Sequence, residues 1–222
     1  MRHLPLLSAM ILAVGCRGGA ATADPPAGEV HLVAILPFFD ETGRSSYDGD
    51  EFGSILASEF VKVSGVRALR PSQLRAALDP GEKIETIGDA VRLARKLGAD
   101  TVLACAITDY DPYDPPRVGI HAQLLRSEPR ALSTKDLDLL LQSASWRKGP
   151  LPLSRDGARH ALAAFEEVYD ARDAGTRRLI QAYARKVSLR ETELVAVQPR
   201  YMQFVSSQII TRAWELARFH GS

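Results

Sequence analysis

The sequence contains only two cysteines, Cys16 and Cys105, among its 222 residues, too few for a disulfide framework. Its 28 basic and 27 acidic residues give a net charge of +1, so it lacks the basic excess of a nucleic-acid-binding domain. The nucleophile elbow, the phosphate-binding loop and the dinucleotide fingerprint are all missing. We therefore expect no catalytic residue, no cofactor and no nucleic-acid partner.

Metal-ligand spacing is also missing. The five histidines are His3, His31, His121, His160 and His220, and no two of them stand at the i,i+4 spacing of a helical zinc site. We interpret them as structural or surface residues and expect no metal site. Cys105 lies within the apolar stretch TVLACAI, which predicts a buried and unreactive thiol because burial raises the pKa of such a group.

The first residues of the chain indicate export. A basic start at residues 1–3 precedes residues 4–15, twelve residues of which only Ser8 is polar. This run is shorter than the about 20 residues of a membrane-spanning helix and is typical of a signal peptide. Residues 13–16, AVGC, resemble a bacterial lipobox, in which a peptidase cuts before a cysteine that then carries lipid. We expect a lipoprotein signal peptide over 1–15 and lipidation, palmitate included, at Cys16.

A competing cleavage site remains open. Ala21-Thr22-Ala23 fits the ordinary signal peptidase, and a cut before Asp24 would release a secreted or soluble periplasmic protein. Residues 16–29, rich in Gly, Ala and Pro, predict a flexible tether, which is useful if its front end is fixed in lipid. Three acyl chains exceed the two-signal threshold for stable anchoring. Arg17 after the cysteine, by resemblance to enterobacterial sorting, favours the outer membrane, with the domain facing the periplasm.

Residues 30–222 predict a single α/β domain, a mixed sheet layered with helices. Short apolar or β-branched runs predict strands at 30–36, 66–69, 101–107 and 117–126. Apolar residues at helical spacing predict helices over 52–63, 71–78, 86–97, 133–141 and from 199 or 200 to the C-terminus. Residues 158–186 fit either one long helix or a strand at 162–169 and a helix at 174–186; we favour the strand.

Two acidic segments are candidates for function. Residues 109–116, DYDPYDPP, fit a hairpin turn or strand exit, a rigid tyrosine-bearing edge for protein binding, or a Ca²⁺ loop. Residues 40–44, DETGR, fit a turn better than an acid–base pair, because adjacent carboxylates in an extended loop point apart.

Two stretches carry a family resemblance. Residues 35–43, ILPFFDETG, and residues 94–103, ARKLGADTVL, resemble blocks of a broad group of bacterial envelope proteins. The group includes the amino-terminal domain of the Tol translocation protein, the curli secretion-channel lipoprotein and lipoprotein activators of penicillin-binding proteins. The resemblance covers about residues 30–126 and leaves 127–222 as a C-terminal extension. It implies an α/β domain that binds other envelope proteins.

The leading hypothesis is a lipid-anchored, non-enzymatic binding or assembly component of the cell envelope, with an envelope protein as partner. Its expected contact residues are Phe39, Asp40, Tyr110, Asp111 and Tyr113. One alternative is a ligand-binding or hydrolytic enzyme in which Asp40, Asp109 and Asp111 converge in a cleft at the carboxyl ends of the strands. Another is a subunit of an oligomeric export channel.

Overall fold

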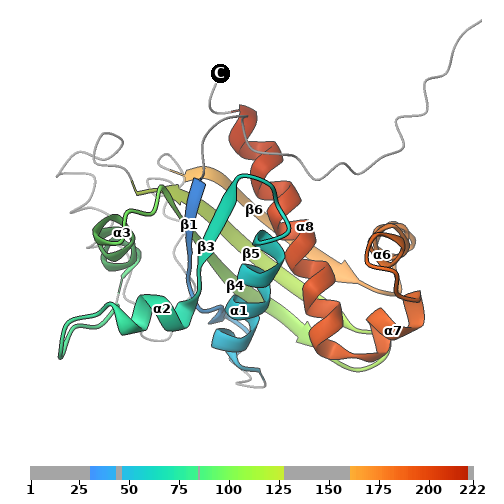
Figure 1. The fold of residues 1–222 in the computed structure, drawn as a ribbon. Helices are drawn as coiled ribbons and strands as arrows, with labels where there is room; N and C mark the ends of the chain where they lie inside the picture. The colour runs from blue at the N-terminus through green and yellow to red at the C-terminus, as the bar shows by residue number, and fades with distance from the viewer. Residues whose placement is uncertain (1–30, 44–46, 85, 128–160, 220–222) are drawn as a thin grey trace, which may run out of the picture.

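The computed structural model describes residues 31–43, 47–84, 86–127 and 161–219. They form a mixed sheet with helices on both of its faces (Figure 1), which confirms the predicted class. The strands are β1 (His31–Ile35), β2 (Phe39–Asp40), β3 (Val66–Leu69), β4 (Thr101–Asp111), β5 (Arg117–Arg126) and β6 (Ala161–Asp170). The helices are α1 (Gly49–Phe60), α2 (Pro71–Ala76), α3 (Ile87–Lys96), α6 (Ala174–Lys186), α7 (Glu191–Ala196) and α8 (Gln198–Phe219).

The strand order is β3-β1-β4-β5-β6, and β2 pairs with β4 beyond the end of β1. β3, β1 and β4 are parallel, whereas β4, β5 and β6 are antiparallel. The sheet therefore has two distinct ends. We call the end at which β1, β3 and β4 begin the tether end, because the predicted tether joins β1 there, and the end with the β4–β5 hairpin the hairpin end.

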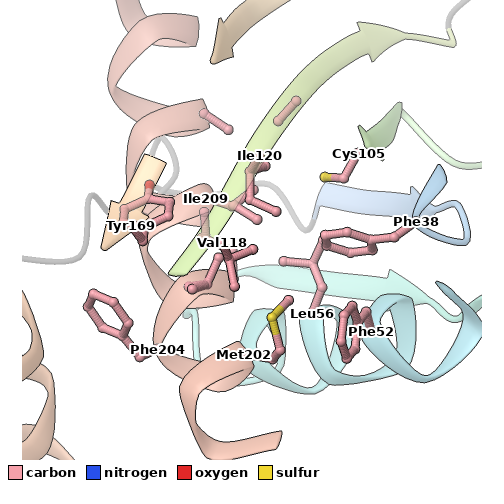
Figure 2. Packing of buried hydrophobic residues seen from close by; sticks show 14 of the residues in the cluster. Phe38, Phe52, Leu56, Cys105, Val118, Ile120, Tyr169, Met202, Phe204 and Ile209 are labelled. Atoms are coloured by element: carbon pink, nitrogen blue, oxygen red, sulfur yellow. The ribbon is translucent and has the colours of Figure 1, made fainter. Parts of the chain in front are cut away.

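α1 and α8 cover one face of the sheet and form the larger core. Alternate strand residues, such as Ile35 and Ile120, point into this core, where they meet Phe52 and Leu56 of α1 and Phe204 of α8 (Figure 2). α8 runs the length of the sheet, as Figure 1 shows. The apolar face of α8 thus covers most of one side of the core, as the amphipathic sequence of this helix predicts.

α2 and α3 cover the opposite face of the sheet near β1 and β4. The intervening strand residues, such as Ala34 and Val102, pack there against Val91 of α3. Because both faces are covered, β1 and β4 are apolar along most of their length rather than alternating. The predicted capping box of α3 is present, since the Thr86 hydroxyl accepts the backbone N–H of Asp89 at 3.0 Å while the Asp89 carboxylate accepts the N–H of Thr86 at 2.9 Å.

The C-terminal half also follows the favoured interpretation. β6 and α6 replace the alternative single helix over 158–186, and Asp173 caps α6. The sequence pattern did not predict β2 or α7, which contain two and six residues. The expected signal peptide, tether and 133–141 helix lie outside the described residues.

Candidate protein-binding surface

Phe39 and Asp40 lie in β2, at the hairpin end of the sheet. The Asp40 carboxylate shapes the turn that follows, because one of its oxygens accepts the backbone N–H of Thr42 at 2.9 Å and that of Gly43 at 3.1 Å. Gly43 has a φ of 69°, a left-handed conformation that glycine adopts without steric cost. The predicted turn is thus confirmed for residues 40–43, and Asp40 is its organising side chain.

An aromatic cluster joins the two segments predicted to form the surface, 38–48 and 109–116. The Tyr47 ring stacks on Phe52 with centroids 5.3 Å apart and meets Tyr110 at 5.2 Å. The Tyr47 hydroxyl donates to the backbone carbonyl of Phe39 at 2.9 Å. Burial, assisted by the charge of Asp40, raises the pKa of Tyr47, so this phenol stays neutral and fixes β2 in place.

Tyr110 belongs to the core, which corrects its expected place on the surface. Its side chain is only 4% exposed, and its phenol oxygen accepts a hydrogen bond at 2.6 Å from the Gln198 amide at the start of α8. Burial raises the pKa of Tyr110, while the bond from Gln198 acts in the opposite direction. Tyr110 therefore ties β4 to α8 and does not offer its ring to a partner.

The β4–β5 hairpin contains the remaining two predicted contact residues, Asp111 and Tyr113. Asp109 pairs with Arg117 across the hairpin, and Asp111 lies 3.7 Å from the guanidinium of Arg172, just beyond β6. The Asp111 carboxylate also accepts the backbone N–H of Tyr113 at 3.2 Å. Tyr113 itself is 79% exposed, the largest exposed fraction among the large apolar side chains that the structure describes. The hairpin alternative for 109–116 is thus confirmed, with Tyr113 in its turn.

The first helix is held unusually close to the segment that leads into β2. A Cβ atom on Gly49 would lie 2.1 Å from the carbonyl oxygen of Phe38, and one on Gly53 would lie 2.6 Å from the Pro71 ring and 2.9 Å from the Leu36 oxygen. The backbone N–H of Phe38 donates to the Gly49 carbonyl at 2.9 Å. These two glycines therefore set the position of β2 relative to α1.

The three carboxylates of the enzyme alternative have separate partners. Asp40 organises its own turn, Asp109 pairs with Arg117, and Asp111 lies beside Arg172. Within 31–43, 47–84, 86–127 and 161–219, no group of three or more His, Cys, Asp and Glu side chains could hold a metal ion.

Cys105 lies in the centre of β4, and its side chain packs into the core beneath α1 and α8 (Figure 2). Burial raises the pKa of the Cys105 thiol well above its usual value, so the thiolate needed for nucleophilic chemistry does not form near neutral pH. The predicted buried thiol is confirmed.

A small cavity with a mainly apolar lining lies elsewhere, between α1, α6 and α8. Its volume of about 20 Å³ is enough for one water molecule, and its lining includes Glu59, Lys62, Tyr183 and Ser207. Glu59 is buried and bonded to the Lys62 ammonium at 2.5 Å. Burial and the Glu59 charge raise the pKa of Tyr183. The cavity is too small for an organic ligand.

Sequence reasoning missed three residues that shape this region: Tyr47, Val197 and Gln198. Tyr47 and Gln198 hold β2 and Tyr110 in place, and Val197 is an exposed apolar side chain before α8. The sequence signal for Tyr47 is an aromatic residue inside an otherwise polar loop. Gln198 carries no comparable signal, because its partner is 88 positions away in the chain.

The anchoring hypothesis concerns Cys16 and the expected absence of a membrane-spanning helix. Cys16 lies outside the described residues. Of the helices that the structure describes, none has both the length and the apolar character needed to cross a membrane.

No family model and no curated protein matches the chain. Among solved structures, a PelC dodecamer from Paraburkholderia phytofirmans aligns with 22% identity and a TM-score of 0.30, covering 47% of this chain and 66% of that chain. The hypothetical protein CT253 from Chlamydia trachomatis aligns over 85% of this chain and 99% of its own, with 11% identity and a TM-score of 0.44. The lipoprotein GNA1162 from Neisseria meningitidis aligns over 71% and 96%, with 14% identity and a TM-score of 0.39. These likenesses are distant, and they assign no activity to this chain.

Proposed function

We propose that the protein is a lipid-anchored lipoprotein of the outer membrane, in which Cys16 carries the anchor and the hairpin end binds another envelope protein. The domain acts as a non-enzymatic binding or assembly component facing the periplasm. The sequence of residues 1–29 supports the anchor, and the arrangement of the hairpin end supports the binding role.

The two ends of the sheet support this division of roles. β1, which follows the predicted tether, begins at the tether end, whereas Tyr113 lies in the turn after β4 at the hairpin end. β4 has 11 residues, which corresponds to about 35 Å at the usual rise of a strand. A domain tethered at the first end thus presents the hairpin some tens of ångströms further from the membrane.

The exposure of Tyr113 is the single observation that carries the binding role. A tyrosine buries a large area on binding at little cost in side-chain entropy, and such residues are enriched among interface anchors. The ion pair of Asp109 with Arg117 joins the two strands of the hairpin, and Asp111 lies beside Arg172, so little backbone freedom remains to be lost on binding. The Tyr113 side chain is already positioned for a partner.

Site-specific photocrosslinking in whole envelopes tests this role. A photoreactive amino acid at position 113 is expected to form one discrete adduct with an envelope protein. The same group at position 179, an exposed leucine on α6, is the matched control and should give no such adduct. A Tyr113→Ala chain expressed alongside should compete weakly for the partner while unfolding at the same temperature as the wild type. Equal adducts from both positions, or none from position 113, would contradict the proposal.

A further inference from the structure

We infer that the tether end of the domain forms a second contact with the membrane, a basic and partly apolar face that rests on anionic lipid headgroups. This inference rests on the proposed lipid anchor, and it concerns residues that the anchor itself does not involve. Three segments that are far apart in the sequence form this face: the turn between α1 and β3, the beginnings and ends of neighbouring strands, and the last turns of α8.

Contacts around the first residue of β1 define the face. The backbone N–H of His31 donates to the Gly65 carbonyl at 2.8 Å, which places the α1–β3 turn directly beside the point where the chain enters the sheet. The His31 ring lies 6.3 Å from the ring of Trp214 on α8, and Trp214 in turn meets Phe60 at 6.5 Å. Figure 1 shows the α1–β3 turn, the start of β1 and the C-terminal end of α8 at the same end of the molecule.

The apolar component of the face is Val61, which follows the last residue of α1. Its side chain is 69% exposed, although the neighbouring Phe60 and Val63 are both buried in the core. The turn continues with Ser64 and Gly65, small residues that let the backbone approach a surface closely. An exposed valine at the start of such a turn can enter the boundary between headgroups and acyl chains.

The charged side chains that the strands contribute to the face are basic. Arg67 near the start of β3 pairs with Leu32, and Arg126 at the end of β5 pairs with Thr101 in the next row of the sheet; both arginines are exposed. The nearby acid Asp100 is occupied in the fold, because its carboxylate accepts the backbone N–H of Leu32 at 2.7 Å. Anionic lipids attract each basic side chain near their surface, and each such residue raises the affinity for the membrane about fivefold.

Because of the predicted tether, a weak contact is sufficient to keep the domain on the membrane surface. Residues 16–29 comprise 14 residues, and a flexible chain of this length has an end-to-end distance of about 20 Å. A domain held so close to the bilayer meets the lipid surface at a millimolar effective concentration, so millimolar affinity is enough to keep it there. Contact through the tether end also turns the hairpin end away from the membrane.

Depth-dependent fluorescence quenching of the full, lipidated chain tests the inference. The protein is placed in vesicles of phosphatidylethanolamine and phosphatidylglycerol, and a thiol-reactive fluorophore is attached to Val61→Cys. Tyr113→Cys at the hairpin end is the matched control, and the buried Cys105 does not compete for the label. A spin-labelled lipid in the same vesicles quenches any fluorophore that touches the headgroup region.

We expect severalfold stronger quenching at position 61 than at position 113, and we expect Arg67→Glu with Arg126→Glu to remove most of the difference. Vesicles of phosphatidylcholine alone should give the same loss, because they carry no net charge. If the protein floats with the vesicles but both positions are quenched equally, the membrane contact is refuted and the anchor stands. If the protein does not float, both the anchor and the contact are refuted.

Discussion

Replacement of Gly49 by alanine tests the close packing that positions β2. The added Cβ would lie 2.1 Å from the Phe38 oxygen, so the two atoms must separate by about 1.3 Å to reach the 3.4 Å of an ordinary contact. That movement also strains the 2.9 Å bond from the Phe38 N–H to the Gly49 carbonyl. Overpacking of this kind costs about 1–3 kcal/mol, and the better helix propensity of alanine returns up to about 1 kcal/mol. We expect a net loss of about 1–2 kcal/mol in the free energy of unfolding.

Thermal unfolding followed by circular dichroism measures this loss. Each kcal/mol shifts the midpoint by about 2–4 °C in a domain of this size, so Gly49→Ala should lower Tm by about 2–8 °C. Ser54→Ala, on the same helix and only partly buried, is the control and should leave Tm unchanged or slightly higher. A Gly49→Ala protein as stable as the wild type would refute the close approach of α1 to the Phe38 carbonyl.

Three further predictions concern buried or capping groups. Tyr110→Phe should cost about 0.5–1.5 kcal/mol in urea unfolding by removing the bond from Gln198, whereas Tyr110→Ala should cost about 3–5 kcal/mol because it also leaves a cavity; equal effects would contradict the core placement of the ring. The backbone N–H of Thr176 lowers the pKa of Asp173 in the folded protein, so the Asp173 carboxylate stabilises the fold above the unfolded pKa of 3.8 and loses this effect as the pH falls through the lower folded value. Asp173→Asn should therefore make acid unfolding less steep, and an unchanged acid profile would count against this cap. Cys105 should resist a thiol reagent in the native protein and react fully in urea, and rapid labelling of the native state would show that β4 is accessible.

Local signals in the sequence predicted most of the secondary structure correctly. The capping box at Thr86 and Asp89 and the strand at 66–69 depend on neighbouring residues alone, so both could be read directly. Buried strands such as β1 are nearly continuous apolar runs because helices cover both faces of the sheet. β2 and α7 were missed because two and six residues are too few to show a repeating apolar pattern.

The place of Tyr110 shows what the sequence did not reveal. A β-bulge shifts the register of β4 between Ile107 and Asp109, so the residues after it exchange faces. Strict alternation from Ile107 would place Asp109 in the core; the bulge instead turns Asp109 toward Arg117 and Tyr110 inward. In the sequence, Tyr110 stands among aspartates and prolines and resembles an exposed residue. Its burial depends on the partner strand β5 and on Gln198, both of which are distant in the chain.

The intact mass of the mature protein, purified from the membrane fraction, tests the proposed anchor most directly. The proposal predicts a chain that begins at Cys16 and carries three acyl chains, and predicts that Cys16→Ser abolishes this species. A lipid-free chain beginning at Asp24, recovered from the soluble fraction, would contradict it.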